Sequence, residues 1–325
     1  MPMSRRHNNI DTDTKIQNAK INLNEFCSRL GLEIINNCDI QNSCKINDLI
    51  FSTYNVNRPG LQLTGFYEHF VHSRVQVIGE METTYLMSMD SQKRTSVLDK
   101  LFSFDIPCMV CTHNINPCQE IINSAKKYNR VLLSSKENTT NFSNKLSIYL
   151  NEILAETITL HGVLVDVYGV GMFLRGDSGV GKSEIALELV QRNHRLVADD
   201  AVTIKNINDI LIGTSPPITR HFMEVRGIGI VDIRSIYGAG AVRDTKKIEM
   251  IVELEDWSPN KEYDRLGNKA KDFKILGKSI PEFTIPVKTG RNLAVILEVA
   301  ARNFRLKEMG YDPLKTLNER MTNKE

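Results

Sequence analysis

The chain has 325 residues, enough for two domains with a buried core in each. Its composition is that of an ordinary globular protein and its formal net charge is +2, so nothing indicates binding to nucleic acid or to a membrane surface. No apolar run is long enough to span a membrane, and residues 1–20 lack the apolar stretch of a signal peptide. We therefore expect a cytoplasmic protein that begins with a disordered polar tail.

Residues 21–150 alternate between strand and helix patterns. Residues 74–78, 107–111 and 130–133 are predicted strands, and residues 117–128 a predicted helix. Residues 134–144 are rich in Ser, Thr and Asn and indicate a loop, whereas residues 142–154 have helical periodicity and lead into a second domain. This rhythm predicts an α/β domain. We expect this domain either to sense a ligand or only to build an oligomer.

All six cysteines precede residue 151: Cys27, Cys38, Cys44, Cys108, Cys111 and Cys118. Cys108 and Cys111, followed by His113, suggest a metal or redox site. However, residues 106–111 are apolar and strand-like, and no second Cys/His pair completes a tetrahedral set. We expect these thiols to pack in a core.

Residues 176–183 match the phosphate-binding loop pattern G-x-x-x-x-G-K-[ST] at every fixed position. The predicted nucleotide-binding residues are Gly176, Asp177, Ser178, Gly179, Val180, Gly181, Lys182 and Ser183. The glycines allow a tight turn whose N–H groups approach an anion. Lys182 supplies charge for the β- and γ-phosphates, and Ser183 supplies a hydroxyl ligand for Mg²⁺.

The residues on both sides of this loop favour a genuine phosphate site over a chance match in a Gly-rich turn. Residues 163–167 are a β-branched run, and residues 172–174 are apolar and enter the loop. Apolar residues recur at helical spacing over residues 185–190, and Asn193 is a candidate left-handed cap. The loop is therefore expected at a helix N-terminus, where free N–H groups favour phosphate.

Two further segments carry candidate charges. An apolar strand over residues 194–198 ends in Asp199 and Asp200, and an acid there can reach Mg²⁺ or the nucleophile; we expect this strand to pack beside the loop. Glu224 and Arg226 are two residues apart and would share one face of a strand, suited to Mg²⁺ and phosphate respectively. The simpler alternative for Asp199 and Asp200 is a solvated turn. For Glu224 and Arg226 it is a surface salt bridge.

The remaining elements are a strand over residues 248–254, a short strand and basic loop over residues 284–292, and a long helix from residue 291 that stops at Gly310. The tail beyond Pro313 is polar. His161 stands just before the strand at residues 163–167, where a strand-edge histidine is the ordinary interpretation.

In this order the segments closely resemble the bacterial HPr kinase/phosphorylase family. The segments are H-G-V-L-V-D-V-Y-G-V-G from His161, the loop with Glu184 after it, H-R-L-V-A-D-D from His194, E-V-R-G-I-G-I from Glu224, Y-G-A-G from Tyr237, Y-D-R-L-G from Tyr263 and G-R-N-L-A from Gly290. The resemblance covers residues 157–310, and is weaker in the first domain, at N-R-P-G from Asn57 and G-F-Y from Gly65.

The resemblance implies a two-domain α/β protein: residues 21–150 form the N-terminal α/β domain, and residues 151–325 form a P-loop kinase domain of the phosphoenolpyruvate-carboxykinase-like type with a C-terminal helix. It implies a bifunctional enzyme. In one direction ATP or pyrophosphate phosphorylates a serine of HPr, the phosphocarrier of the sugar phosphotransferase system. In the other, inorganic phosphate removes that phosphoryl group and yields pyrophosphate. It also implies a homohexamer.

The resemblance assigns roles by position. Lys182 stabilises the phosphoryl group, Ser183 and Glu224 bind Mg²⁺, and Asp200 takes the serine proton and returns it in the reverse reaction. His161 and Arg265 match further active-site positions: Arg265 neutralises phosphoryl charge, and His161 orients Asp200 or contacts phosphate. The signature tied to both reactions comprises Glu224, Val225, Arg226, Gly227, Ile228, Gly229, Ile230, Val231, Asp232 and Ile233. The segment tied to dephosphorylation comprises Pro286, Val287, Lys288, Thr289, Gly290 and Arg291.

The chain departs from the family pattern at Lys288 and Thr289, where the family usually has Arg-Pro. Lysine keeps the charge but loses the bidentate fork for phosphate, and threonine frees a backbone that proline would fix. Two other functions are compatible with a phosphate-binding loop. A GTPase is disfavoured because the guanine motif N-K-x-D is absent, although another P-loop small-molecule kinase is an alternative. A non-catalytic regulator that binds ATP and HPr is disfavoured because Lys182, Asp200 and Arg265 are all present.

Overall fold

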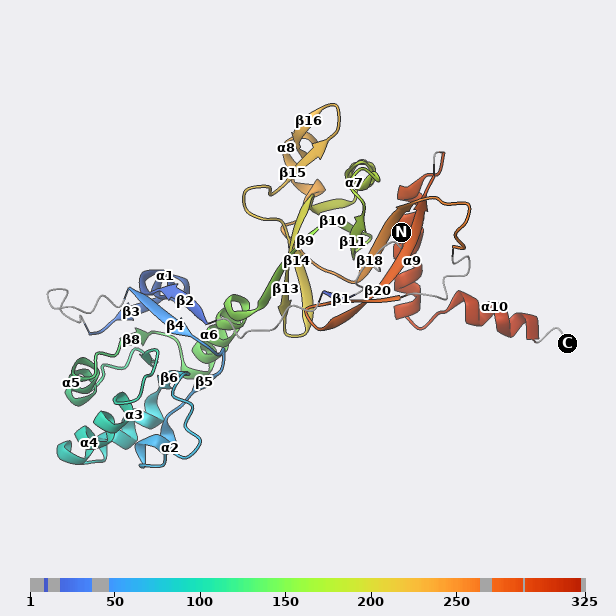
Figure 1. The fold of residues 1–325 in the computed structure, drawn as a ribbon. Helices are drawn as coiled ribbons and strands as arrows, with labels where there is room; N and C mark the ends of the chain where they lie inside the picture. The colour runs from blue at the N-terminus through green and yellow to red at the C-terminus, as the bar shows by residue number, and fades with distance from the viewer. Residues whose placement is uncertain (1–8, 11–17, 37–46, 264–270, 289, 323–325) are drawn as a thin grey trace, which may run out of the picture. The chain divides into compact units, whose positions relative to one another are not determined.

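The computed structural model describes residues 9–10, 18–36, 47–263, 271–288 and 290–322. The chain divides into two compact units, Thr14–Ala155 and Glu156–Glu325, with strand β1 (Asn9–Ile10) belonging to the second (Figure 1). Both units combine helices with sheets, so the expected α/β class is confirmed. Two parts of the expected disordered tail are strands: β1, which pairs with β19 (Lys271–Ile275), and the start of β2 (Ala19–Asn22).

The first unit is built on a five-stranded sheet with the order β3-β8-β7-β6-β5. Strands β5 to β8 run parallel and β3 pairs antiparallel with β8. The strands are β3 (Leu32–Ile34), β5 (Val56–Asn57), β6 (Val75–Ile78), β7 (Met109–Cys111) and β8 (Leu132–Ser135), and β2 pairs with β4 (Asp48–Phe51) in a separate ribbon. The helices are α1 (Leu23–Leu30), α2 (Gly60–Leu63), α3 (Glu80–Met87), α4 (Ser91–Phe102), α5 (Gln119–Lys127) and α6 (Thr139–Leu154).

The sequence located the strands β6, β7 and β8 and the helix α5, but the loop predicted over residues 134–144 is wrong. Strand β8 runs to Ser135, and α6 already begins at Thr139. The Asn138 side chain accepts a hydrogen bond from the Asn141 N–H, so the polar run is a helix cap. Cys108 and Cys111 are buried, and burial raises the pKa of Cys111 to about 12, as expected for core thiols.

The second unit is built on a seven-stranded mixed sheet with the order β1-β19-β20-β18-β11-β10-β12. Strands β10 and β11 form an antiparallel hairpin, whereas β11, β18 and β20 run parallel to one another. The strands are β10 (Val163–Val167), β11 (Val170–Gly176), β12 (Arg195–Ala198), β18 (Met250–Asp256) and β20 (Lys278–Val287). The carboxyl ends of the three parallel strands therefore meet at one edge of the sheet.

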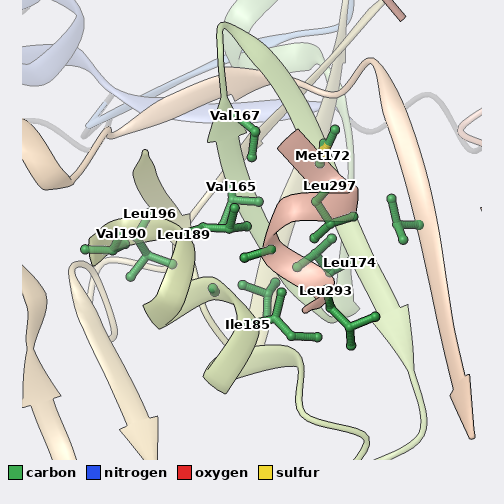
Figure 2. Close-up of a cluster of buried hydrophobic side chains, with 14 of the residues drawn as sticks. Val165, Val167, Met172, Leu174, Ile185, Leu189, Val190, Leu196, Leu293 and Leu297 are labelled. Carbon is green, nitrogen blue, oxygen red and sulfur yellow. The ribbon is translucent and has the colours of Figure 1, made fainter. Parts of the chain in front are cut away.

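Helices α7 (Lys182–Gln191) and α9 (Leu293–Glu308) bury their apolar faces against this sheet. Figure 2 shows side chains from β10 and β11 interleaved with those of the two helices, among them Val165, Leu174, Leu189 and Leu297. Each of these four side chains is fully buried. The phosphate-binding loop is thus carried by a strand and a helix that share one core.

A second sheet has the order β17-β14-β13-β9, with β9 (Glu156–His161), β13 (Ala201–Ile207), β14 (Ile210–Thr214) and β17 (Thr245–Lys247). Strands β15 (Phe222–Val225) and β16 (Gly229–Asp232) form a hairpin that is followed by α8 (Ile233–Tyr237) and a short 3₁₀ helix, Ala239–Ala241. The hairpin stands beside α7 in Figure 1.

One expectation for this unit needs correction, and two others gain detail. The strand that ends before Asp199, β12, lies beside the loop as expected, since Asp199 accepts a hydrogen bond from Ser183, and it pairs with β10. Arg226 lies beyond the end of β15, in the hairpin turn, so it does not share a strand face with Glu224. The polar tail contains helix α10 (Pro313–Thr322), none of whose side chains is buried.

Gly171 lies where β11 meets the backbone of the β17–β18 connection, and it has no room for a side chain. A Cβ there would stand 1.8 Å from the Lys247 carbonyl oxygen, which is backbone and cannot move aside cheaply. We expect Gly171→Ala to lower the free energy of unfolding by about 3 kcal/mol, because overpacking forces the strand apart. Calorimetry of the full chain would show this as a lower melting temperature. Gly240→Ala, which meets open space, is the control, and an equal loss there would contradict the account.

Candidate active site

The residues before α7 form a loop whose backbone closes around the helix N-terminus. Gly176 has φ +142, and a Cβ there would stand 2.2 Å from the Leu254 carbonyl oxygen. Gly181 has φ 96 and is the N-cap of α7. The expected arrangement of strand, glycine-rich loop and helix is present, and Asn193, with φ 67, takes the expected left-handed conformation after the helix. The N-terminal N–H groups of α7 therefore face the loop, as phosphate binding requires.

Lys182 holds the loop together from the first turn of α7. Its side chain is buried, and Nζ donates to the carbonyl oxygens of Gly176 and Asp177, at 3.0 Å each. The loop backbone is where phosphate oxygens are expected to bind. The buried ammonium of Lys182, held by two loop carbonyls, therefore lies close to those oxygens. The positive charge is thus fixed in position before any substrate arrives.

Asp199 is the important residue that the assignment by resemblance omitted. Its side chain is 3% exposed, and its carboxylate accepts from Ser183 Oγ at 2.9 Å and from the Glu224 N–H at 3.2 Å. Burial raises the pKa of Asp199, and the charge of Asp200 adds to this, while both hydrogen bonds oppose it. The sequence signal that could have identified Asp199 is its position directly after the apolar strand β12. Asp199 links the two expected Mg²⁺ ligands through one carboxylate.

Asp200 turns the other way, toward His161. It is a non-glycine residue with φ 66, which aspartate tolerates better than most residues. His161 Nδ1 lies 3.1 Å from Asp200 Oδ1, and the Gly162 N–H donates to the Asp200 carbonyl. Both side chains are more than half exposed, at 55% and 75%. His161 is therefore placed to orient the carboxylate of Asp200, which faces solvent where a protein substrate could reach it.

These groups line one pocket of about 170 Å³. Its walls are His161, Val163, Ser178, Gly179, Gly181, Lys182, Ser183, Glu184, Asp199, Asp200, Glu224 and Arg226. Arg226 reaches the loop from the hairpin, since a Cβ on Gly179 would stand 3.0 Å from its guanidinium. Of the loop residues, Gly176, Asp177 and Val180 are not in the wall, and Val180 is buried in the core. Arg265 lies outside the described residues.

The predicted dephosphorylation segment begins with the last two residues of β20, Pro286 and Val287, at the end of the sheet that also carries the loop after β11. Lys288 Nζ lies 4.5 Å from the ring centre of Trp257, and Arg291 Nη1 donates to the Pro286 carbonyl at 3.4 Å. No residue of this segment lines the pocket among the described residues, and Thr289 lies outside them. The segment therefore lies at the same end of the sheet as the phosphate-binding loop but does not line the pocket.

The chain matches two known families of protein domains. Residues 152–321 match the family described as HPr Serine kinase C-terminal domain, and residues 21–150 match HPr Serine kinase N terminus. The chain belongs to the HPr serine kinase family. The two matches together take in both compact units.

Curated relatives are similar to this chain over nearly their whole length. A protein named HPr kinase/phosphorylase from Caldanaerobacter subterraneus subsp. tengcongensis is 48% identical over 93% of this chain and 97% of its own. One of the same name from Peptoclostridium acidaminophilum is 47% identical over 95% and 98%. The solved structure of the Hpr(Ser) kinase/phosphatase from Coxiella burnetii is 33% identical, covers 50% of this chain and 99% of that chain, and gives a TM-score of 0.45.

In the described part of the chain, no helix combines the length and the apolar character needed to cross a bilayer.

Proposed function

We propose that this protein is a bifunctional HPr kinase/phosphorylase. It transfers a phosphoryl group from ATP or pyrophosphate to a serine of HPr, and it returns that group to inorganic phosphate. The observation that carries the proposal is the convergence of Lys182, Ser183, Asp200 and Glu224 on one pocket. Membership of the family, with relatives of that name, supports the choice of HPr as substrate.

In the kinase direction, the loop N–H groups and Lys182 hold the donor phosphates. Asp200 accepts the proton of the serine hydroxyl as its oxygen attacks the terminal phosphorus, and the bond from that phosphorus to the donor's bridging oxygen breaks. His161, 3.1 Å from Asp200, keeps the carboxylate oriented for this transfer. Two arginines balance the phosphoryl charge in this proposal. One is Arg226, which lies beside Gly179, and the other is Arg265.

Mg²⁺ fits this donor set. Ser183 Oγ and the backbone N–H of Glu224 both donate to the Asp199 carboxylate, and the Ser183 and Glu224 side chains line the same pocket. Mg²⁺ is usually held by one or two carboxylates together with substrate phosphates. No group of three His, Cys, Asp or Glu side chains in the described residues could hold a metal unaided. When bound, Mg²⁺ supplies charge that stabilises the transferring phosphoryl group.

In the reverse direction, an oxygen of inorganic phosphate attacks the phosphorus of phosphoserine. The bond to the serine oxygen breaks, Asp200 returns its proton to that oxygen, and pyrophosphate leaves. One carboxylate can therefore serve as base and then as acid in the same site. Because the same carboxylate serves both directions, a single pocket can carry out both reactions.

Four broader features complete the proposal and rest on the family resemblance. The catalytic unit is of the phosphoenolpyruvate-carboxykinase-like P-loop type, and the protein works as a homohexamer in the cytoplasm. The first unit serves in regulation or oligomerisation. Gel filtration with light scattering tests the hexamer, since a mass of one chain would exclude it.

The proposed kinase reaction is tested by incubating the full chain with HPr, Mg²⁺ and ATP and following HPr by intact mass. We expect a gain of one phosphoryl group, and none on HPr whose target serine is replaced by alanine. ATP binding without any gain of mass would leave a non-catalytic regulator or a kinase for another substrate.

The departure at residues 288–289 gives a separate prediction. Arginine at 288 could still stack on Trp257 and would add a bidentate fork for phosphate. We expect Lys288→Arg/Thr289→Pro to raise the phosphorolysis rate about threefold and to leave the kinase rate unchanged. Lys274→Arg, on an exposed face of β19, is the control. An unchanged phosphorolysis rate would show that the departure is neutral.

A further inference from the structure

The β15–β16 hairpin presents different residues on its two faces. Met223 pairs with Val231, and both pack against the core of the second unit. Side chains alternate along a strand, so the neighbouring pair, Glu224 and Ile230, projects from the opposite face. Glu224 lines the catalytic pocket. Ile230 therefore stands directly across from a pocket residue, at the Cβ separation of about 5 Å that such pairs have.

Two more apolar residues flank this pair. Phe222 lies on the same face as Ile230, diagonally across the hairpin, and Ile228 lies in the turn. Ile230 is 78% exposed, Ile228 75% and Phe222 42%. We call Phe222, Ile228 and Ile230 the hairpin ledge. Single exposed apolar side chains are common on protein surfaces. The ledge differs because three lie on one small hairpin next to a carboxylate of the pocket (Figure 1, where β15 and β16 are labelled).

We propose that the hairpin ledge docks an apolar surface of HPr beside its target serine, an inference that rests on the proposed function. A protein substrate must bring its serine to Asp200, which is exposed at the pocket mouth. Its surface must then extend over the rim, where Glu224 joins the pocket to the ledge. Apolar anchors surrounded by polar groups are the usual energetic centre of such contacts.

The composition of the pocket wall indicates that the phosphoryl donor binds in the pocket and does not occupy the hairpin ledge. Its described wall is dominated by charged and polar groups, including Lys182, Asp199 and Arg226, which suit phosphates. Pyrophosphate, the smaller proposed donor, has no apolar part that could contact the ledge. The ledge is therefore expected to affect recognition of HPr and not recognition of the donor.

The test is steady-state kinetics of the full chain carrying Phe222→Thr, because Phe222 is the ledge residue outside the signature tied to both reactions. The change removes the apolar ring but keeps a residue that favours a strand. We expect KM for HPr to rise about tenfold, with KM for ATP and kcat within twofold of the wild type. Ile210→Thr, an exposed isoleucine at the start of β14, is the matched control and should change neither constant.

Three outcomes would overturn the proposal: an unchanged KM for HPr, a raised KM for ATP alone, which would assign the ledge to the nucleotide, or a changed oligomeric mass by light scattering, which would assign it to a second copy. An equal melting temperature in wild type and variant excludes unfolding as the cause. If the wild type itself does not phosphorylate HPr, the proposed function fails, and this result is distinct from failure of the ledge.

Discussion

Replacement of Lys182 by methionine is expected to lower kcat by about 10³-fold in both the kinase and the phosphorolysis reaction. Methionine keeps the length and apolar stem of the side chain but removes the charge and all three donors. In the wild type, Nζ is buried and held 3.0 Å from the carbonyl oxygens of Gly176 and Asp177. Its charge is thus positioned in advance, and no other described loop residue carries a positive charge to replace it.

Initial rates of phosphoserine formation and of pyrophosphate release measure the effect of Lys182→Met. Lys274→Met, on the exposed face of β19, is the matched control and should keep both rates. Circular dichroism would check that the variant is folded. Rates within threefold of the wild type would remove Lys182 from the proposed mechanism.

Replacement of Asp200 by asparagine is expected to lower both rates by about 10²- to 10⁴-fold, the usual contribution of general acid–base catalysis. Asparagine has nearly the same shape and tolerates the left-handed backbone found here, with φ 66. The contact with His161 can persist, but the side chain can no longer take up or return a proton. Binding of ATP, measured by calorimetry, should be unchanged.

Asp209→Asn is a close control for Asp200→Asn. Asp209 also has φ 66 and also stands in a turn at the start of a strand, but its carboxylate pairs with Lys278 on the surface. Both rates should survive this change. Loss of the kinase rate alone in Asp200→Asn would mean that another group supplies the proton in the reverse reaction.

Much of the candidate site could be predicted because local sequence determines it. The loop at residues 176–183 needs only a strand, three turn-forming glycines and a helix, and each of these has a signal within a few residues. Left-handed Asn193 was also foreseeable, since few residues other than glycine take that conformation readily. Positions of this kind depend little on distant parts of the chain.

What the sequence did not disclose depends on pairing between distant segments. Whether β12 lies beside β10 or β11 is decided by the β10–β11 hairpin, which no single segment specifies. The bond from Ser183 to Asp199 joins a helix to a strand end, and only the folded chain tells Asp199 from its neighbour Asp200. The loop predicted before α6 was wrong because Asn and Thr serve both turns and helix caps.

The most direct measurement gives purified phosphoserine-HPr to the enzyme with Mg²⁺ and inorganic phosphate, without ATP, and follows HPr by intact mass and pyrophosphate by a coupled assay. The account predicts one pyrophosphate formed for each phosphoryl group lost, with both signals abolished in Lys182→Met and in Asp200→Asn. Loss of the phosphoryl group without pyrophosphate would mean hydrolysis by water and would contradict phosphorolysis. Unchanged phosphoserine-HPr would contradict a single pocket that runs the transfer in both directions.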